Sequence, residues 1–255
     1  MLIFRFFVKV FANITKVLCY LFHFLFPKKR FLLPSMSPPI IDFGGVTKIP
    51  RVIWQTNYTQ TVTLPVYINY LWNRVLAPTY SYRFVTTEER AFFIANSCNM
   101  TVSDAYQRLQ IGASQADLWR ILVLLKQGGV YMDIDAHLVW PLSLVISDDI
   151  DDLFLRMKNG YLTNYFIASS PGNYNIRKIA EKIIENIANE SFDNVYDITG
   201  PGVFDQVFGK NLPRNRDYRI TCNQGNFTNE YFQYIDKPAG KWTQEQKGTN
   251  PVKPR

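Results

Sequence analysis

The sequence predicts an α/β fold with a partly parallel sheet, mainly because strand and helix signals alternate along it. From residue 49 onward, short runs of β-branched and aromatic residues alternate with longer amphipathic segments. This order favours parallel pairing, because a helix carries the chain back before the next strand begins. The 255 residues, 47% hydrophobic and 19% charged, suit one globular domain with a sizeable core and appended segments.

The first elements expected are two strands and two helices. The stretch IPRVIWQT (49–56) predicts a core strand that leads into a polar loop, and residues 82–85 predict a second strand. A helix is expected from Thr86 through Ala95, because Glu88 and Glu89 supply an acidic first turn. The next helix covers 114–127, with apolar residues at helical spacing, Ser114 as the N-cap and Gly128 as the stop.

Three further elements follow the second helix. Residues 165–168 predict a short strand, and isoleucines recurring from Ile176 to Ile187 predict an amphipathic helix. The stretch 199–202 (TGPG) predicts a turn into another helix.

The most informative stretch is GGVYMDID, residues 128–135. On a strand, Asp133 and Asp135 project to one side while Ile134 points to the other. Two convergent carboxylates at a strand end can hold Mg²⁺ or Mn²⁺, which favour oxygen ligands and are often shared with substrate phosphates. The pattern therefore points to chemistry on a nucleotide diphosphate. The alternative is a strand that simply runs into a polar turn.

A second pair, Asp117 and Arg120, lies upstream on the helix expected at 114–127. The two residues are three apart, so their side chains are neighbours on the helix surface. One reading is a solvated ion pair worth a few tenths of a kcal/mol. The other is a functional pair beside Asp133 and Asp135 that contacts sugar hydroxyls.

The N-terminus reads as a membrane-associated helix. Residues 1–26 are strongly apolar, and their polar side chains fall in one narrow stripe made by Arg5, Lys9, Asn13, Lys16, Tyr20 and His23. This pattern fits a helix in the plane of the membrane, with basic residues reaching headgroups. Its length permits spanning, but Lys9 and Lys16 would then be buried in lipid. The alternative is a helix packed on the protein itself.

The expected organisation is a membrane-anchor helix at 1–30, a Pro- and Gly-containing linker at 31–48, the main domain at 49–242 and a polar tail at 243–255. No nucleic-acid partner is expected. Six basic residues lie within 1–30, so 22 of the 28 basic side chains remain against 21 acidic ones, and the surplus of +7 belongs almost wholly to the N-terminus.

The compartment has two readings. The three cysteines lack metal-binding spacing and suit buried positions in a reducing compartment. With Lys28–Arg30 against anionic lipid, this favours the cytoplasmic face of a bacterial inner membrane. Asn-X-Ser/Thr sequons at Asn13, Asn57, Asn99, Asn189 and Asn226 leave a type II Golgi membrane protein as the alternative.

Four stretches in the same order resemble glycosyltransferase family 32, which includes fungal Golgi mannosyltransferases and bacterial capsule and lipopolysaccharide enzymes. They are 49–56 (IPRVIWQT), 112–135 (GASQADLWRILVLLKQGGVYMDID), 164–172 (NYFIASSPG) and 199–201 (TGP). The long middle stretch is the most specific. The resemblance implies a GT-A fold, a Rossmann-like mixed sheet flanked by helices. It also implies a nucleotide-sugar donor (UDP- or GDP-sugar) bound with Mn²⁺ or Mg²⁺, and retention of anomeric configuration.

The resemblance also assigns roles to residues. It implies a catalytic set of Asp117, Arg120, Asp133 and Asp135 and a donor-binding set of Trp54, Gln55, Thr56, Asp117, Arg120, Asp133 and Asn164. Asp135 would coordinate the metal, with Asp133 as a further ligand, and the 169–172 turn would lie near donor or acceptor. Many members complete the metal site with a His followed by Ser-Trp. Here Asp236 is the candidate oxygen ligand, and Lys241 stands before Trp242.

Two functions are expected from different classes. The first is a retaining, metal-dependent glycosyltransferase that moves a hexose to a surface-polysaccharide or lipid-linked glycan. The second is a non-catalytic, membrane-bound module that binds a nucleotide sugar or a glycan.

Overall fold

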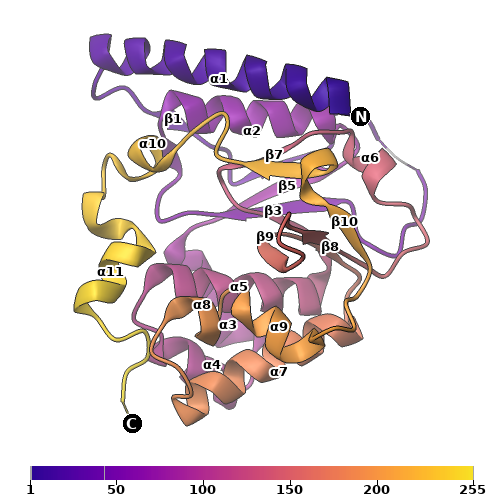
Figure 1. The fold of residues 1–255 in the computed structure, drawn as a ribbon, viewed down its shortest axis with the longest axis vertical. Coiled ribbons are helices and arrows are strands. Elements are labelled where there is room, and N and C mark those ends of the chain that lie inside the picture. Colours follow the sequence, from indigo (N-terminus) through magenta and orange to yellow (C-terminus); the bar gives the residue numbers. More distant parts are fainter. Residues whose placement is uncertain (1, 43, 255) are drawn as a thin grey trace.

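The computed structural model describes residues 2–42 and 44–254, which form three layers around a central sheet (Figure 1). Helices α1 (Leu2–Leu25) and α2 (Leu64–Leu76) lie on one side of the sheet, and α5 (Gly112–Gln127) and α7 (Tyr174–Asn189) lie on the other. Met1, Phe43 and Arg255, one residue each of the expected anchor, linker and tail, lie outside the described residues.

The central sheet has seven strands in the order β10-β8-β9-β6-β3-β5-β2. Strand β3 pairs in parallel with β5 and β6, whereas β9 runs antiparallel to β6 and β8, so the sheet is mixed. This confirms the expected α/β fold class. The strands are β2 (Met36–Ser37), β3 (Val52–Thr56), β5 (Ser81–Val85), β6 (Gly129–Met132), β8 (Asp152–Arg156), β9 (Leu162–Ser169) and β10 (Asn215–Asp217).

The remaining elements surround this frame. Two small antiparallel pairs join β1 (Phe31–Leu32) to β4 (Thr61–Val62) and β7 (Ala136–Leu138) to β11 (Cys222–Gln224). The other helices are α3 (Thr87–Ser97), α4 (Met100–Arg108), α6 (Leu142–Val145), α8 (Val195–Ile198), α9 (Gly202–Phe208), α10 (Glu230–Tyr234) and α11 (Trp242–Gly248), with 3₁₀ turns η1 (Tyr218–Ile220) and η2 (Pro238–Gly240).

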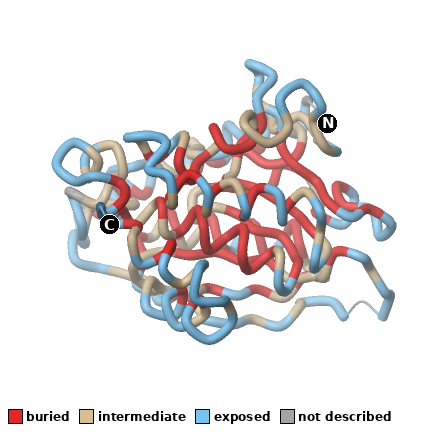
Figure 2. The backbone as a smooth tube through the Cα atoms, turned by 90° about the horizontal axis from the view of Figure 1, so that it is seen from below, coloured by how far each residue is buried: buried red, intermediate tan, exposed pale blue. Residues whose placement is uncertain are grey.

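Two hydrophobic cores fill the spaces on either face of the sheet. The buried segments lie in the middle of the molecule and the exposed ones around its rim (Figure 2). Along β6, Val130 and Met132 belong to the core under α2, and Tyr131 between them belongs to the core under α5. Alternation of side chains along a strand explains this division. Because both faces are covered, the strands read as continuous apolar runs rather than alternating ones.

Two glycines explain how α5 passes into β6 without a longer loop. Gly128 has φ +66° and ends the helix, and a Cβ there would lie 2.7 Å from Pro171 Cδ. Gly129 has φ +107°, and a Cβ there would lie 2.6 Å from Val52 Cγ1. Only glycine combines a positive φ with such close approach, so the pair fixes where the strand begins and where Asp133 emerges.

The segments expected to be a linker (31–48) and a polar tail (243–255) both contribute ordered structure. Residues 31–48 supply β1 and β2, and β2 is the edge strand of the central sheet. Leu33 is fully buried in the core under α2. Residues 243–255 begin within α11, and Val252 is buried and bridges Leu109. The sequence did not predict β1 and β2, because strands of two residues are too short to show an alternating pattern. The Pro and Gly residues of this segment instead suggested a linker.

Helix α1 packs on the protein and also exposes an apolar face. Val8, Ala12, Cys19 and His23 are buried against the body, whereas Ile3, Val17 and Phe24 are 76%, 66% and 81% exposed. Part of the polar stripe faces the protein and not a headgroup layer, although Lys9 and Tyr20 are exposed. Lys16 donates to the Gly225 carbonyl and His23 accepts from the Leu64 amide. Of the helices among the described residues, α1 is the one long and apolar enough to cross a membrane.

Candidate functional site

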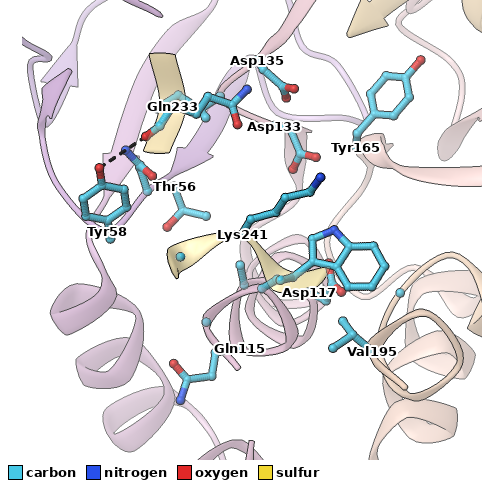
Figure 3. Close-up of a pocket in the computed structure, with 18 of the residues that line it drawn as sticks. Thr56, Tyr58, Gln115, Asp117, Asp133, Asp135, Tyr165, Val195, Gln233 and Lys241 are labelled. Atoms are coloured by element: carbon cyan, nitrogen blue, oxygen red, sulfur yellow. Dashed lines mark hydrogen bonds between the residues drawn. The ribbon is translucent and has the colours of Figure 1, made fainter. Parts of the chain in front are cut away.

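A cavity of about 860 Å³ lies where the carboxyl ends of β3, β5 and β6 meet. Parallel strands that end at one edge leave such a crevice, which is the usual ligand site of α/β sheets. Thr56, Thr87 and Asp133 line the cavity at the three strand ends. Its opposite wall comes from the C-terminal part of the chain, including Gln233 and Lys241 (Figure 3).

Asp133 and Asp135 belong to a tight turn between β6 and β7. The Asp133 amide donates to the Tyr165 carbonyl, and the Ala136 amide donates to the Asp133 carbonyl, which closes the turn. Both carboxylates line the cavity. The side-chain amide of Gln224 lies between them, with its Nε2 2.9 Å from Asp135 Oδ1 and 3.3 Å from Asp133 Oδ2. The two carboxylates therefore converge, although Asp133 and Asp135 both lie beyond the end of β6 and not on the strand as expected.

Asp117 and Arg120 form a buried pair beside this turn, not a solvated one. Arg120 Nη2 lies 2.9 Å from Asp117 Oδ1, and both side chains are under a tenth exposed. The same guanidinium lies 3.3 Å from Asp133 Oδ1 and stacks 4.4 Å from the centre of the Tyr131 ring. Arg120 lies one turn after Asp117 on α5, and its guanidinium therefore contacts the carboxylates of both Asp117 and Asp133.

Two other predicted segments hold Asp117 in place. Asn164 of β9 donates to Asp117 Oδ1 at 2.9 Å, and its carbonyl accepts from Arg120 at 2.8 Å. Thr199, from the TGP segment, donates to Asp117 Oδ2 at 3.1 Å. Every oxygen of this buried carboxylate therefore has a partner, as a buried charge requires.

Burial governs the ionisation of these groups. It raises the pKa of Asp117 to about 7, although Arg120 acts in the opposite direction. Burial and the nearby Asp133 raise the pKa of Asp135 to about 6. Burial would lower the pKa of Arg120, but Asp133 and other neighbouring groups keep it above its ordinary value. Burial also raises the pKa of Tyr131, which stays protonated and donates to Asp133 at 2.7 Å.

The carboxylate pair fits a divalent cation. Asp133 and Asp135 already share one donor group, so a cation could replace the Gln224 amide between them. Mg²⁺ and Mn²⁺ use one or two carboxylates and complete their shell with water and phosphate oxygens. Among the described residues, no group of three or more His, Cys, Asp or Glu side chains could hold a metal ion. Any further ligand would have to be a neutral oxygen or come from the donor.

Of the three donor-binding residues expected on β3, Thr56 lines the cavity and Trp54 does not. The Trp54 side chain lies in the core under α5, where its Nε1 donates to the Gly128 carbonyl. Gln55 is buried beneath the turn and donates to the Asp133 carbonyl. Alternation along the strand turns Trp54 toward α5, so its expected contact with donor is corrected to a structural role.

Two other expectations also differ from the structure. Asp236, the proposed third metal ligand, pairs with Arg30 through two contacts of 2.6 Å and does not line the main cavity. The turn at 169–172 lies at the other end of β6 from Asp133, because antiparallel β9 places Ser169 opposite Gly129. Asn164, from the same predicted segment, does reach the cavity.

Several residues of the site had no local signal in the sequence. Gln224 contacts both carboxylates from 89 or more positions away. Lys237 and Lys241 line the same wall and pair with Glu245 and Glu230. The Lys241 side chain extends toward Asp133 (Figure 3).

Comparison with known proteins relates this chain to glycosyltransferases. Residues 65–153 match the model of a glycosyltransferase sugar-binding region containing a DXD motif. The chain is 24% identical over 222 residues to the initiation-specific alpha-1,6-mannosyltransferase of Schizosaccharomyces pombe. That match covers 74% of this chain and 53% of the fungal protein, so the chain spans about half the length of the curated relative it matches.

A solved structure supports the fold independently. The PaToxG glycosyltransferase superposes with a TM-score of 0.51 at 19% identity, over 65% of this chain and 70% of the other. At this identity the likeness concerns the fold, which is the mixed sheet with its flanking helices.

Proposed function

Because this chain belongs to the glycosyltransferases that carry a DXD sugar-binding region and is similar to family 32, we propose that it transfers a hexose from a nucleotide-diphosphate sugar. The observation that carries the proposal is the convergence of Asp133 and Asp135 at a cavity edge beside the buried Arg120. The acceptor would be a surface-polysaccharide or lipid-linked glycan.

The residues support this chemistry in complementary ways. Asp135, with Asp133, would hold Mn²⁺ or Mg²⁺, which when bound would offset charge that develops on the leaving diphosphate. Arg120 is a fixed cation that needs no reorganisation, because Asp117, Asn164 and Tyr131 already hold it. Asp117 and Asn164 would orient the donor sugar.

Retention of anomeric configuration is also proposed, by a front-face displacement. Asp117 is held by three partners and is therefore unsuited to act as a free nucleophile. The stereochemistry is read from the NMR coupling of the product formed early in the reaction. An inverted product would contradict this step and leave the transferase proposal intact.

The donor is best searched for among GDP- and UDP-sugars with Mn²⁺ or Mg²⁺, beginning with a mannosyl donor because the fungal relative is named a mannosyltransferase. Asp135→Asn should reduce metal-dependent donor turnover by at least about a hundredfold, as loss of a group that stabilises developing charge does. Asp104→Asn, an exposed carboxylate on α4, is the matched control. Equal turnover in both variants would rule out this site.

We propose that α1 lies in the plane of a membrane, with its apolar outer face in the lipid. The outward residues Ile3, Val17 and Phe24 support this, as does the packing of the opposite face on the body. A combined Val17→Gln and Phe24→Gln variant should lose vesicle co-sedimentation by about tenfold or more, since each buried apolar side chain contributes roughly 1.5–3 kcal/mol. Undiminished sedimentation would contradict the proposal.

Two cellular locations are proposed, and glycosylation of the asparagine sequons distinguishes them. The cytoplasmic face of a bacterial inner membrane predicts unmodified asparagines. A type II Golgi location predicts glycans on exposed sequons, and Asn99 and Asn189 are the exposed ones among the five. Endoglycosidase treatment of the cell-derived protein, followed by mass measurement, distinguishes these outcomes.

A non-catalytic binding module is the second candidate. It is favoured by the absence, among the described residues, of a third acidic or His ligand beside the carboxylate pair. Calorimetric binding of a nucleotide sugar without transfer or hydrolysis, under any divalent metal, would support it over the transferase.

A further inference from the structure

Helix α1 reaches the wall of the cavity that faces the carboxylate pair. Lys16 Nζ donates to the Gly225 carbonyl at 3.1 Å, and Asn229 donates to the Tyr20 hydroxyl at 2.6 Å. Both Gly225 and Asn229 line the cavity. Tyr20 also packs on Phe232 of α10, with ring centres 4.5 Å apart. A helix expected to be only an anchor therefore contacts two segments of the site.

The Lys16 contact continues directly to Asp133 and Asp135. Gly225, whose carbonyl accepts from Lys16, donates its own amide to the Asp135 carbonyl at 3.1 Å. The preceding residue, Gln224, contributes the side-chain amide that lies between the two carboxylates. A single turn, Gln224–Gly225, is thus hydrogen-bonded to α1 on one side and to the carboxylate turn on the other.

We propose that Lys16 of α1 is a positioning residue for the site, because it fixes the Gln224–Gly225 turn that closes the Asp133 and Asp135 pair. Lys16 touches neither carboxylate. It holds the Gly225 carbonyl, and Gly225 in turn donates its amide to the Asp135 carbonyl.

The chemistry of this contact suits a positioning role. Hydrogen bonds from a charged donor are stronger than neutral ones, and this one is partly buried. Gly225 has φ +77°, a backbone conformation that favours glycine, and it uses its carbonyl for Lys16 and its amide for the Asp135 carbonyl. Because α1 is packed on the body through Val8, Ala12 and Cys19, the Lys16 ammonium has a defined place, and its hydrogen bond fixes the position of Gly225.

This inference deepens the proposed function, because it rests on the same carboxylate pair. If a lipid surface changes how α1 packs on the body, that change and binding at the carboxylates are coupled, and such coupling is reciprocal in free energy.

The test uses the full chain on vesicles of phosphatidylglycerol and phosphatidylcholine, with Lys16→Met, Lys16→Arg and the control Lys9→Met. Lys9 is an exposed lysine on the same helix, so the control makes the same chemical change away from the turn. Backbone hydrogen exchange at residues 222–229 and the affinity for Mn²⁺ alone are measured. Neither readout needs turnover, so a failure of the proposed transferase activity leaves this test readable.

Lys16→Met should speed exchange at 222–229 about tenfold, the factor that corresponds to ~1.4 kcal/mol, and should weaken Mn²⁺ binding about tenfold. Lys16→Arg should restore both values, and Lys9→Met should match the wild type. Unchanged exchange at 222–229 in Lys16→Met overturns the proposal. Faster exchange spread over β3 and β6 also overturns it, because Lys16 would then stabilise the whole fold instead of this turn.

Discussion

The two walls of the cavity are built in different ways. The inner wall, made by Asp117, Arg120, Asn164 and Thr199, is buried and its polar groups satisfy one another. The outer wall, made by Gln224, Asn229, Gln233, Lys237 and Lys241, is more exposed. It depends on contacts with α1 and on the ion pairs of Lys237 with Glu245 and of Lys241 with Glu230. The charged groups of the inner wall are therefore held in place before a ligand binds. Those of the outer wall can rearrange when a ligand binds.

Removing Arg120 should have the largest effect on stability. Arg120→Met leaves the buried Asp117 carboxylate without its cation, which is expected to cost about 3–5 kcal/mol in the free energy of unfolding measured with urea. Lys182→Met is the matched control, because Lys182 and Glu185 form an exposed pair at the same i,i+3 spacing. That change should cost less than about 1 kcal/mol. If Arg120→Met and Lys182→Met lowered the free energy of unfolding by similar amounts, the buried pair of the inner wall would be no more important for stability than an exposed pair.

The inner wall should also make stability depend on pH. With a pKa of about 7 in the folded protein and about 3.9 when unfolded, Asp117 binds a proton more tightly in the folded state. The free energy of unfolding should therefore fall as pH rises from about 4 to about 7. Asp117→Asn should flatten this part of the profile in urea titrations at a series of pH values. If the free energy of unfolding of the wild type and of Asp117→Asn depended on pH in the same way, other titrating groups would be responsible for the decrease.

Two residues of the inner wall, Asp117 and Arg120, could be predicted from the sequence because they lie close in the chain to the carboxylate pair. Asp117, Arg120, Asp133 and Asp135 lie within 19 consecutive residues, on a helix and a strand whose patterns are strong. Gly128 was expected to end the helix, and the structure adds the steric reason for both glycines. The fold class followed in the same way, from the order of elements with clear periodicity.

The outer wall could not be predicted, because its contacts join distant segments. Lys16 and Gly225 are 209 positions apart, and neither residue type signals the other. The side that Trp54 faces was equally hidden, since β3 is covered on both faces and its apolar run has no alternation to read. Helix α2, which separates α1 from the sheet, was missed although its face toward the core is apolar.

The smallest stability effect is expected at Lys241, on the outer wall. Its ion pair with Glu230 is 30% exposed on the lysine and 66% on the carboxylate, so Lys241→Met should change the free energy of unfolding by less than about 1 kcal/mol. The donor KM should nevertheless rise about fivefold, because the ammonium lines the cavity opposite the carboxylates. Lys247→Met, at an exposed lysine of α11, the helix that Lys241 precedes, should change neither quantity.

The Lys241 result decides whether the outer wall binds ligand or merely closes the cavity. A raised KM with unchanged stability means that its charge is held for a ligand and that Glu230 is a substitute partner in the free protein. An unchanged KM would leave the donor's contacts to the inner wall and to Gln224. Lost stability as large as that of Arg120→Met would mean that Lys241 is a structural ion-pair partner, and that both walls are built on the same principle.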